Sequence, residues 1–266
     1  MNGSWKITLL EKKPKLTNPI LIEGLPGIGN VGKVAVDFII EELKAKKLYD
    51  VFSYTFPHSV FVNEKNLVEL PMIEIFYKKL PNGRDLLLLA GDVQPIDEIS
   101  SYEFSDKMLD ILGEYAGKEV ITLGGIGLQT IPKKPKVYCT GNSQEIINKY
   151  KAGVELNDKL YRVVGPIVGV SGLLLGLADR RKIPAIALLA ETFGHPMYLG
   201  IKGAKEILYI LDKKLDLNLK IEKLDKEIEE MENEMSKRTG ELGKISKEAA
   251  LRKVQEKANA QTSYIG

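Results

Sequence analysis

Four short, almost wholly apolar runs constrain the fold of this chain more than any other feature. The runs cover residues 19–24, 85–91, 119–125 and 184–190. Such continuous apolar runs are typical of strands buried on both faces, because a strand with one wet face alternates instead. Segments with helical spacing of apolar residues lie between and after them, at residues 31–43, 100–115, 172–181 and 198–215. The alternation predicts an α/β fold, a mainly parallel sheet with helices on both faces.

Further strands are expected between the first helix and the second apolar run. Residues 51–62 and 67–77 are rich in β-branched and aromatic side chains, and the sequence LPNGR at residues 80–84 predicts a hairpin turn. We assign residues 1–215 to a single α/β domain on this pattern.

The chain changes character at residue 216, where Lys and Glu dominate and apolar residues follow each other at intervals of four and three. These residues are Leu217, Ile221, Leu224, Ile228, Met231 and Met235. The spacing is that of a heptad seam. We therefore expect a helical, coiled-coil-like extension over residues 216–258 that mediates oligomerisation or contacts a partner, followed by a flexible tail over residues 259–266.

Composition excludes several classes of protein. Hydrophobic residues make up 44% of the chain, and 38 basic residues nearly balance 36 acidic ones, which argues against disorder and against a nucleic-acid partner. Cys139 is the only cysteine, so an intramolecular disulfide or a thiolate zinc site is excluded. Residues 1–16 lack a secretory pattern, and the most apolar stretch, 163–178, is too short to span a bilayer. We expect a cytoplasmic protein with no membrane partner.

The sequence GLPGIGNVG at residues 24–32 contains the pattern G-x-G-x-x-G from Gly27 to Gly32, between a strand and a helix. That position suits a pyrophosphate at a helix N-terminus. However, the acidic residue expected about 20 residues later is missing, and Val34 replaces the Ser or Thr of a P-loop. A tight turn with positive φ explains the glycines without a ligand, and it predicts that Gly27→Ala destabilises the fold.

Two more glycine clusters fall where strands and helices meet. Residues 124–127 are expected to form a turn after a buried strand, and residues 165–176 open a helix. At the carboxyl edge of a parallel sheet such turns can line a ligand pocket, whereas plain crossover turns are the simpler explanation. The residues of this candidate ligand edge are Gly27, Gly29, Gly125, Ser171 and Glu191.

Catalytic chemistry has little support. His58 and His195 are the only histidines, and no carboxylates stand at metal-ligand spacing near them. Ser171 resembles a nucleophile elbow but has Leu173 where the second glycine belongs. Glu191 follows a buried strand, where a carboxylate serves either as an acid or base, or as an acceptor of backbone N–H groups. We predict no catalytic residue, no metal and no cofactor.

Three segments resemble the PAC2 family. They are ILIEGLPGIGNVG at residues 20–32, GPIVGVSGLL at 165–174 and PAIALLAET at 184–192. The resemblance covers residues 19–215. It implies a nucleoside-phosphorylase-like domain without the catalytic equipment, which forms homo-oligomers and acts as a chaperone or adaptor in proteasome assembly, as archaeal members do. Its partners would be further copies of itself and proteasome subunits or another protein.

Members of this family have also been labelled ATP-grasp ligases. The alternative is therefore a nucleotide- or phosphate-dependent enzyme, ligase-like or phosphorylase-like, that uses the glycine-rich edge.

The resemblance also bears on the C-terminus, because proteasome-binding members end in a hydrophobic residue, Tyr and any residue. Here Tyr264 is third from the end and Ser263 precedes it, so the register is off by one. We predict that Tyr264, Ile265 and Gly266 form a recognition element, for the proteasome or for another protein.

Overall fold

The computed structural model describes residues 5–157, 165–195 and 198–230. The chain divides into two compact units, Met1–Ile221 and Glu222–Gly266. The first unit contains the α/β domain, and the expectations for Met231, Met235 and the tail lie outside the described residues.

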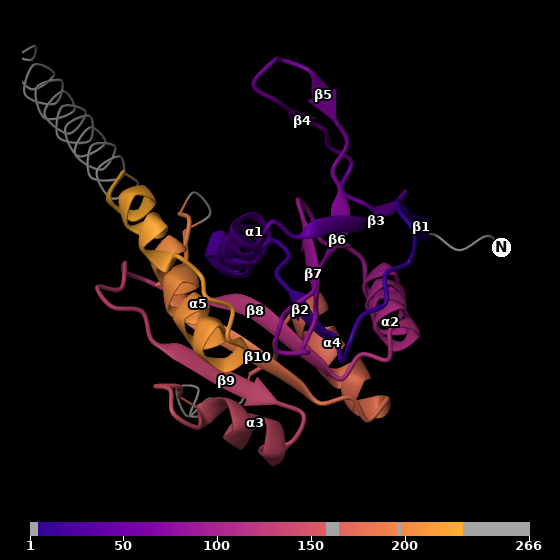
Figure 1. Cartoon of the computed structure of the whole chain (residues 1–266). Coiled ribbons are helices and arrows are strands. Elements are labelled where there is room, and N and C mark those ends of the chain that lie inside the picture. The colour runs from indigo at the N-terminus through magenta and orange to yellow at the C-terminus, as the bar shows by residue number, and fades with distance from the viewer. Residues whose placement is uncertain (1–4, 158–164, 196–197, 231–266) are drawn as a thin grey trace, which may run out of the picture. The chain divides into compact units, whose positions relative to one another are not determined.

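Four parallel strands form the centre of an eight-stranded sheet (Figure 1). They are β7 (Leu86–Gly91), β2 (Ile20–Glu23), β8 (Glu119–Leu128) and β10 (Ala185–Phe193), in that spatial order. Every residue of β2 and β7 is buried, as expected of strands covered on both faces. The predicted fold class is confirmed.

Antiparallel strands flank this centre on both sides. β6 (Ile73–Lys78), β3 (Lys46–Ser53) and β1 (Trp5–Leu9) extend the sheet beyond β7, and β9 (Val137–Gly141) pairs with β10 at the other edge. Residues 80–84 join β6 to β7 as the predicted hairpin turn. β1 and β9 were not predicted from the sequence.

Helices cover both faces of the sheet. α1 (Val31–Leu43) and α5 (Ile201–Leu215) contact each other on one face, and α2 (Glu98–Glu114) and α4 (Val170–Arg180) contact each other on the opposite face. The hydrophobic core beneath α2 and α4 takes alternate residues of the strands, since successive side chains point to opposite faces.

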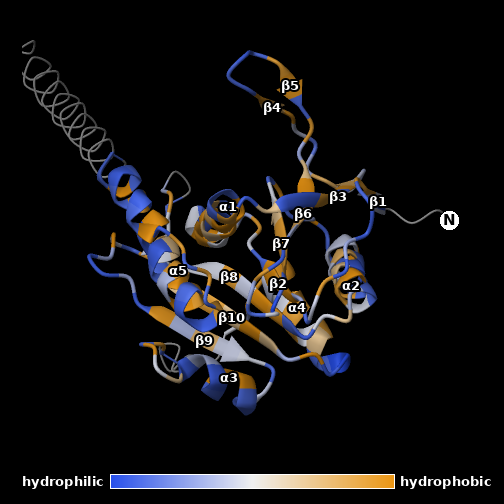
Figure 2. Ribbon diagram, viewed as in Figure 1, coloured by the Kyte–Doolittle hydropathy of each residue, from blue (hydrophilic) through white to orange (hydrophobic). Residues whose placement is uncertain are grey.

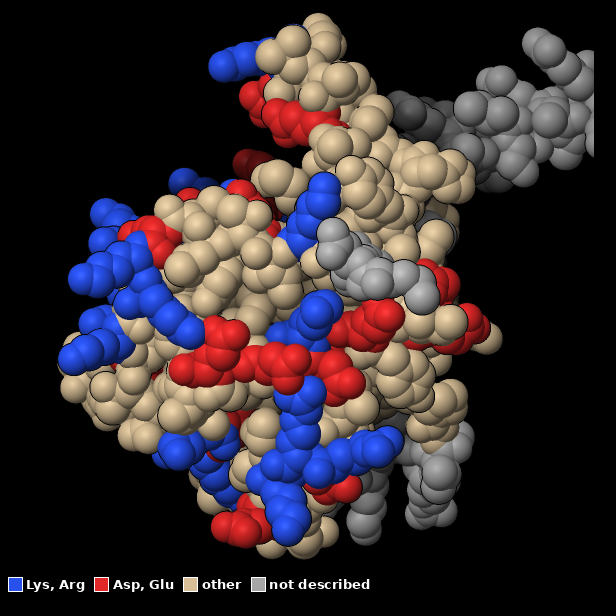
Figure 3. Space-filling model, turned by 90° about the vertical axis from the view of Figure 1, so that its right-hand side faces the viewer, with Lys and Arg blue, Asp and Glu red and all other residues tan. Residues whose placement is uncertain are grey.

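The helices bury one face and expose the other. α5 carries hydrophobic and hydrophilic residues (Figure 2), and Ile207, Leu208 and Leu211 are buried on its inner side. Acidic and basic side chains are interspersed on the face shown in Figure 3. Within the described ranges, no helix combines the length and apolar composition that a membrane crossing requires.

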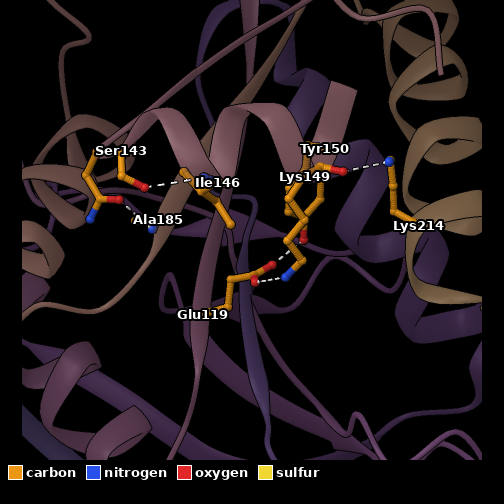
Figure 4. Close-up of polar contacts among 8 residues, drawn as sticks. Glu119, Ser143, Ile146, Lys149, Tyr150, Ala185 and Lys214 are labelled. Carbon is orange, nitrogen blue, oxygen red and sulfur yellow. Dashed lines mark hydrogen bonds and ion pairs between the residues drawn. The ribbon is translucent and has the colours of Figure 1, made fainter. Parts of the chain in front are cut away.

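A further helix, α3 (Gln144–Lys151), is tied to the start of β8 by buried polar contacts (Figure 4). The Tyr150 hydroxyl donates to one carboxylate oxygen of Glu119, and the Lys149 ammonium pairs with the other. Burial raises the pKa of Tyr150 well above its ordinary value. From α5, Lys214 Nζ donates to the Lys149 carbonyl at 2.8 Å.

The strand expected over residues 51–62 ends early. β3 stops at Ser53, and β4 (Phe61–Val62) pairs with β5 (Val68–Glu69) as a separate two-stranded ribbon. Pro57 and Pro71 interrupt the two chain segments at the base of this ribbon, because proline cannot donate to a sheet ladder. We call residues 54–72 the arm; it projects away from the sheet in Figure 1.

The glycines at residues 124–127 do not form the expected turn. β8 continues through them to Leu128, and Gly125 and Gly127 pair with Ala190 and Thr192 of β10. A Cβ on Gly125 would lie 2.2 Å from the Ile28 carbonyl oxygen. The glycines are therefore needed for close packing against the turn that follows β2.

The expected heptad helix does not begin at Leu217. Asp216 and Asn218 have positive φ values of 55° and 58°, which end α5, and residues 217–220 are not helical. Helical structure resumes with η2 (Ile221–Lys223) and continues over residues 224–230, which carry Leu224 and Ile228. Leu217 therefore lies outside this helical stretch, whereas Ile221 begins it, and all four described residues of the expected seam are buried.

Candidate functional site

A cavity of about 740 Å³ lies at the carboxyl ends of β2 and β8, in the size range of small-molecule sites. Its walls are the turns that open α1 and α4 together with the glycine segment of β8. The lining residues are Leu25, Gly27, Ile28, Gly32, Gln94, Pro95, Leu123, Gly124, Gly125, Ile126, Gly127, Gly165, Pro166, Ile167, Val168, Gly169, Ser171 and Leu189.

Between β2 and α1, backbone atoms pack directly against backbone atoms. A Cβ on Gly24 would lie 2.2 Å from the Gly32 carbonyl oxygen, and a Cβ on Gly32 would lie 2.3 Å from the Leu123 carbonyl oxygen. No side chain fits at either position, so the start of α1 packs directly on the backbone of the sheet.

Positive φ in this turn occurs at Gly29 (62°) and Asn30 (50°). Gly27 has an extended backbone with φ −154°, and the nearest atom to a Cβ there is Gln94 Nε2 at 4.0 Å. The expectation that Gly27 needs positive φ is therefore wrong. The left-handed step falls two residues later, where the chain turns into the helix.

Gln94 connects the two helix-opening turns across the cavity. Its Nε2 donates to the Pro26 carbonyl after β2, and its Oε1 accepts from the Val170 amide at 3.1 Å. Gly169, which precedes that amide, has φ 89°. The Gln94 side chain thus uses both its donor and its acceptor to hold the turns together.

Glu23 is a fully buried carboxyl group beneath the cavity. One oxygen accepts from the Leu25 amide at 2.9 Å, and the other accepts from Ser171 Oγ at 2.8 Å. Burial raises the pKa of Glu23 from 4.5 to about 7, although both hydrogen bonds oppose this shift. Glu23 was not predicted from the sequence, where its signal was a single charged residue inside the apolar run 19–24.

The same contact defines what Ser171 can do. While Glu23 is ionised, the hydroxyl proton of Ser171 is directed to it, so Ser171 can then offer a ligand in the cavity only an acceptor. Neither His58 nor His195 belongs to the described lining of the cavity, and the hydrogen bond described for Ser171 Oγ joins it to Glu23.

The structure brings together three of the five residues of the candidate ligand edge: Gly27, Gly125 and Ser171. Gly29 and Glu191 lie outside the described lining. A Cβ on Gly29 would lie 2.7 Å from Thr192 Oγ1. Glu191 is buried and accepts from the Lys136 amide at 3.0 Å, which agrees with its role as an acceptor of backbone N–H groups.

Little at the cavity supports the binding of a metal ion or of a phosphate group through a P-loop lysine. Lys33, the residue in the P-loop position, forms ion pairs with Asp37 at 3.1 Å and with Asp92 at 3.6 Å. The part of the chain that the structure describes contains no group of three or more His, Cys, Asp or Glu residues able to hold a metal ion.

Comparison with known proteins identifies the family. The PAC2 family model matches residues 21–239. An uncharacterized protein of Methanocaldococcus jannaschii is 34% identical over 212 residues, which cover 79% of each chain. The crystal structure of Pyrococcus furiosus PbaB, an archaeal proteasome activator, superposes with a TM-score of 0.82 at 36% identity over 89% of this chain and 99% of that one.

A second structure from the same organism agrees. Pyrococcus furiosus PbaA, an archaeal homolog of proteasome-assembly chaperone, superposes with a TM-score of 0.72 at 26% identity and covers 99% of this chain and all of the other. The order of strands, turns and helices around the cavity, together with these matches, leads to one conclusion: the chain belongs to the PAC2 family.

Proposed function

We propose that this chain is a non-catalytic, cytoplasmic protein-binding factor that acts as a chaperone or adaptor of the proteasome. The observation that carries the proposal is its similarity to PbaB, at 36% identity over almost the whole of that protein. The site chemistry supports it, because Ser171 and Gln94 are engaged in hydrogen bonds that hold the fold together.

Self-association is the second part of the proposal. Leu224 and Ile228 stand four residues apart on the helical segment 224–230, and Met231 and Met235 continue the spacing in the sequence. An apolar stripe on a helix is buried in a partner helix or against other protein. The four described positions, Leu217, Ile221, Leu224 and Ile228, are buried within a single copy of the chain, so this part of the proposal rests on the heptad spacing. A chain truncated after Lys223 tests it, since it keeps Leu217 and Ile221 and removes the other four positions.

The C-terminal residues Tyr264, Ile265 and Gly266 are proposed to bind a groove on the partner. Binding of wild type, Tyr264→Ala and a chain lacking the last three residues should be compared on immobilised proteasome core particles. Ser263→Ala is the matched control, because it changes the neighbouring residue and leaves Tyr264 in place. We expect both tail variants to bind at least tenfold more weakly, and equal binding by all four proteins would contradict this role.

One observation favours a second candidate function. The cavity lies between the N-terminal turns of α1 and α4, where a phosphate group would find backbone N–H donors. A nucleotide- or phosphate-dependent enzyme would bind its ligand here. A thermal-shift measurement with ATP, NAD and inorganic phosphate tests this, since a ligand at 100 times its Kd stabilises the native state by about 2.7 kcal/mol.

A further inference from the structure

The arm, residues 54–72, contains very few hydrogen-bonded strand pairs. Its ladder consists of two residue pairs, Phe61 with Glu69 and Val62 with Val68. An isolated two-stranded hairpin is marginally stable in water at best. A ribbon this short that projects from the domain is expected to gain its stability from something that covers it.

One face of the arm is wholly aliphatic. Val62 and Val68 are direct cross-strand partners and therefore share a face. Val60 and Leu70 stand two residues beyond them, where the alternation of an extended chain would place them on the same face. The four residues are 52% (Val60), 64% (Val62), 71% (Val68) and 58% (Leu70) exposed. β4 and β5 are among the hydrophobic segments of Figure 2 that lie away from the core. We call these four residues the aliphatic face.

The other face and the tip are organised by polar contacts. Asn63 Nδ2 donates to Glu69 Oε1 at 2.7 Å, and Asn63 Oδ1 accepts from the amides of Lys65 and Leu67 at 2.9 and 3.0 Å. Asn66 supplies the positive φ of 58° that the turn requires. These bonds fix the register of the hairpin, so the same four aliphatic side chains are always presented together.

We propose that the aliphatic face of the arm is covered by the same face of a second copy of this chain. Such a contact has two-fold symmetry, in which one patch packs on itself. The ionisable residues Glu64, Lys65 and Glu69 lie at the tip or on the opposite face, so the two apolar faces meet without burying like charges. A second copy necessarily brings a flat face of matching size.

The apolar area of the aliphatic face can be compared with the area that protein interfaces bury. The four exposed side chains offer on the order of 400 Å² of apolar surface, so two copies bury about 800 Å². Tyr54 and Met72 stand at the two ends of the arm and are not counted in this area. A contact of about 800 Å² is the size of a weak, reversible interface. The inference gives the proposed homo-oligomer a contact outside the helical extension and does not depend on proteasome binding.

The first test compares two charge insertions in the full-length chain by sedimentation velocity over a range of concentrations. Val68→Asp places a carboxylate in the aliphatic face. Ile99→Asp is the matched control, because Ile99 is 73% exposed on α2 and lies outside the arm. We expect Val68→Asp to weaken self-association at least tenfold and Ile99→Asp to leave it unchanged. A monomeric wild type, or equal behaviour of the two variants, would overturn the inference.

The second test keeps the inference falsifiable if Val68→Asp fails to fold. Val62→Cys and Val68→Cys are oxidised with copper phenanthroline and resolved on a non-reducing gel. Phe61→Cys, on the opposite face of the same arm, is the control, and the native Cys139 is buried. We expect a disulfide-linked dimer at Val62 or Val68 that exceeds the Phe61 background. Its absence at both positions overturns the proposal.

Failure of this inference is distinguishable from failure of the proposed function. Loss of proteasome binding in the tail variants with cross-linking intact concerns the tail alone and supports self-association through the arm. If the wild type is monomeric and Val68→Asp abolishes binding to the proteasome core, the face belongs to that partner and the assignment to a second copy is wrong.

Discussion

Ser171 Oγ donates a hydrogen bond of 2.8 Å to Glu23 Oε2 across 148 residues of sequence. The contact joins the end of β2 to the first turn of α4, on the side of the sheet that carries α2 and α4. A carboxyl group with no exposed surface is thereby held next to the candidate cavity, and its protonation becomes part of the stability of the fold.

Glu23→Gln is expected to flatten the dependence of stability on pH. The pKa of Glu23 is about 7 in the native state and about 4.5 when exposed, so native Glu23 keeps its proton while the unfolded chain loses it. The stabilisation is fully present below pH 4.5 and is lost as the pH rises through 7. Glutamine mimics the protonated form, so the variant should exceed wild type by up to roughly 3 kcal/mol at pH 8.

Urea unfolding at several pH values checks this prediction. Ser171→Ala is the informative partner variant, because it removes a hydrogen bond that favours the ionised carboxylate. It should steepen the loss of stability toward high pH, and a profile identical to wild type in both variants would contradict the assignment.

Two glycine substitutions in one turn should differ widely. In Gly32→Ala the new methyl group meets the Leu123 carbonyl oxygen at 2.3 Å, so α1 must move away from β8 at a cost of about 3 kcal/mol. In Gly27→Ala the nearest atom is 4.0 Å away and the backbone is extended, so the free energy of unfolding should change by less than about 1 kcal/mol. Denaturant titration of both variants decides, and equal losses would show that the turn is built differently.

Gln94→Ala should loosen the link between the two helix-opening turns. The substitution leaves the Pro26 carbonyl and the Val170 amide without their partner, and the loss is expected to be about 1–3 kcal/mol. Gln144→Ala is the control, because the side-chain hydrogen bond described for that glutamine is an exposed one to Asn148, and its loss should change stability by under ~0.5 kcal/mol. Faster hydrogen exchange at the Val170 amide, in Gln94→Ala alone, would locate the effect.

Tyr150→Phe should destabilise the docking of α3. It removes the hydroxyl that donates to the buried Glu119, at a cost of about 1–3 kcal/mol, while Lys149 still pairs with that carboxylate. Tyr209→Phe, at a tyrosine that is 44% exposed, serves as the control. Thermal unfolding of the two variants measures the difference, and equal melting temperatures would argue against a role for the Tyr150 hydroxyl.

Elements with a strong periodic pattern were predictable from the sequence. The bounds expected for the first helix, residues 31–43, coincide with α1, because an apolar stripe and a glycine turn mark its start. The central strands were equally clear, since burial on both faces leaves continuous apolar runs.

Edge elements were not predictable in this way. β1 is largely exposed and carries Lys6, so its composition does not distinguish it from a polar terminus. α3 has only eight residues and is fixed by long-range contacts such as the one between Tyr150 and Glu119. Its one local signal was Ser143, whose hydroxyl caps the helix by accepting from the Ile146 amide at 3.3 Å.

The cavity was predictable in place but not in detail. The carboxyl edge and three of its lining residues follow from the glycine clusters, whereas Gln94 and Glu23 each depend on a partner far away in sequence, Pro26 at 68 residues and Ser171 at 148 residues. Glycines within a strand and glycines in a turn look alike in sequence, which is why residues 124–127 were assigned to a turn.

The main-chain wall of the cavity also limits how related proteins can vary. Gly24, Gly32 and Gly125 have no side chain to shorten, and any side chain added there collides with a carbonyl oxygen. Substitution can therefore reshape the cavity only where its lining carries side chains, from the buried Leu25 to the exposed Ile28 and Val168. Two relatives could keep the same glycine backbone and still accept different molecules, because those side chains would determine selectivity.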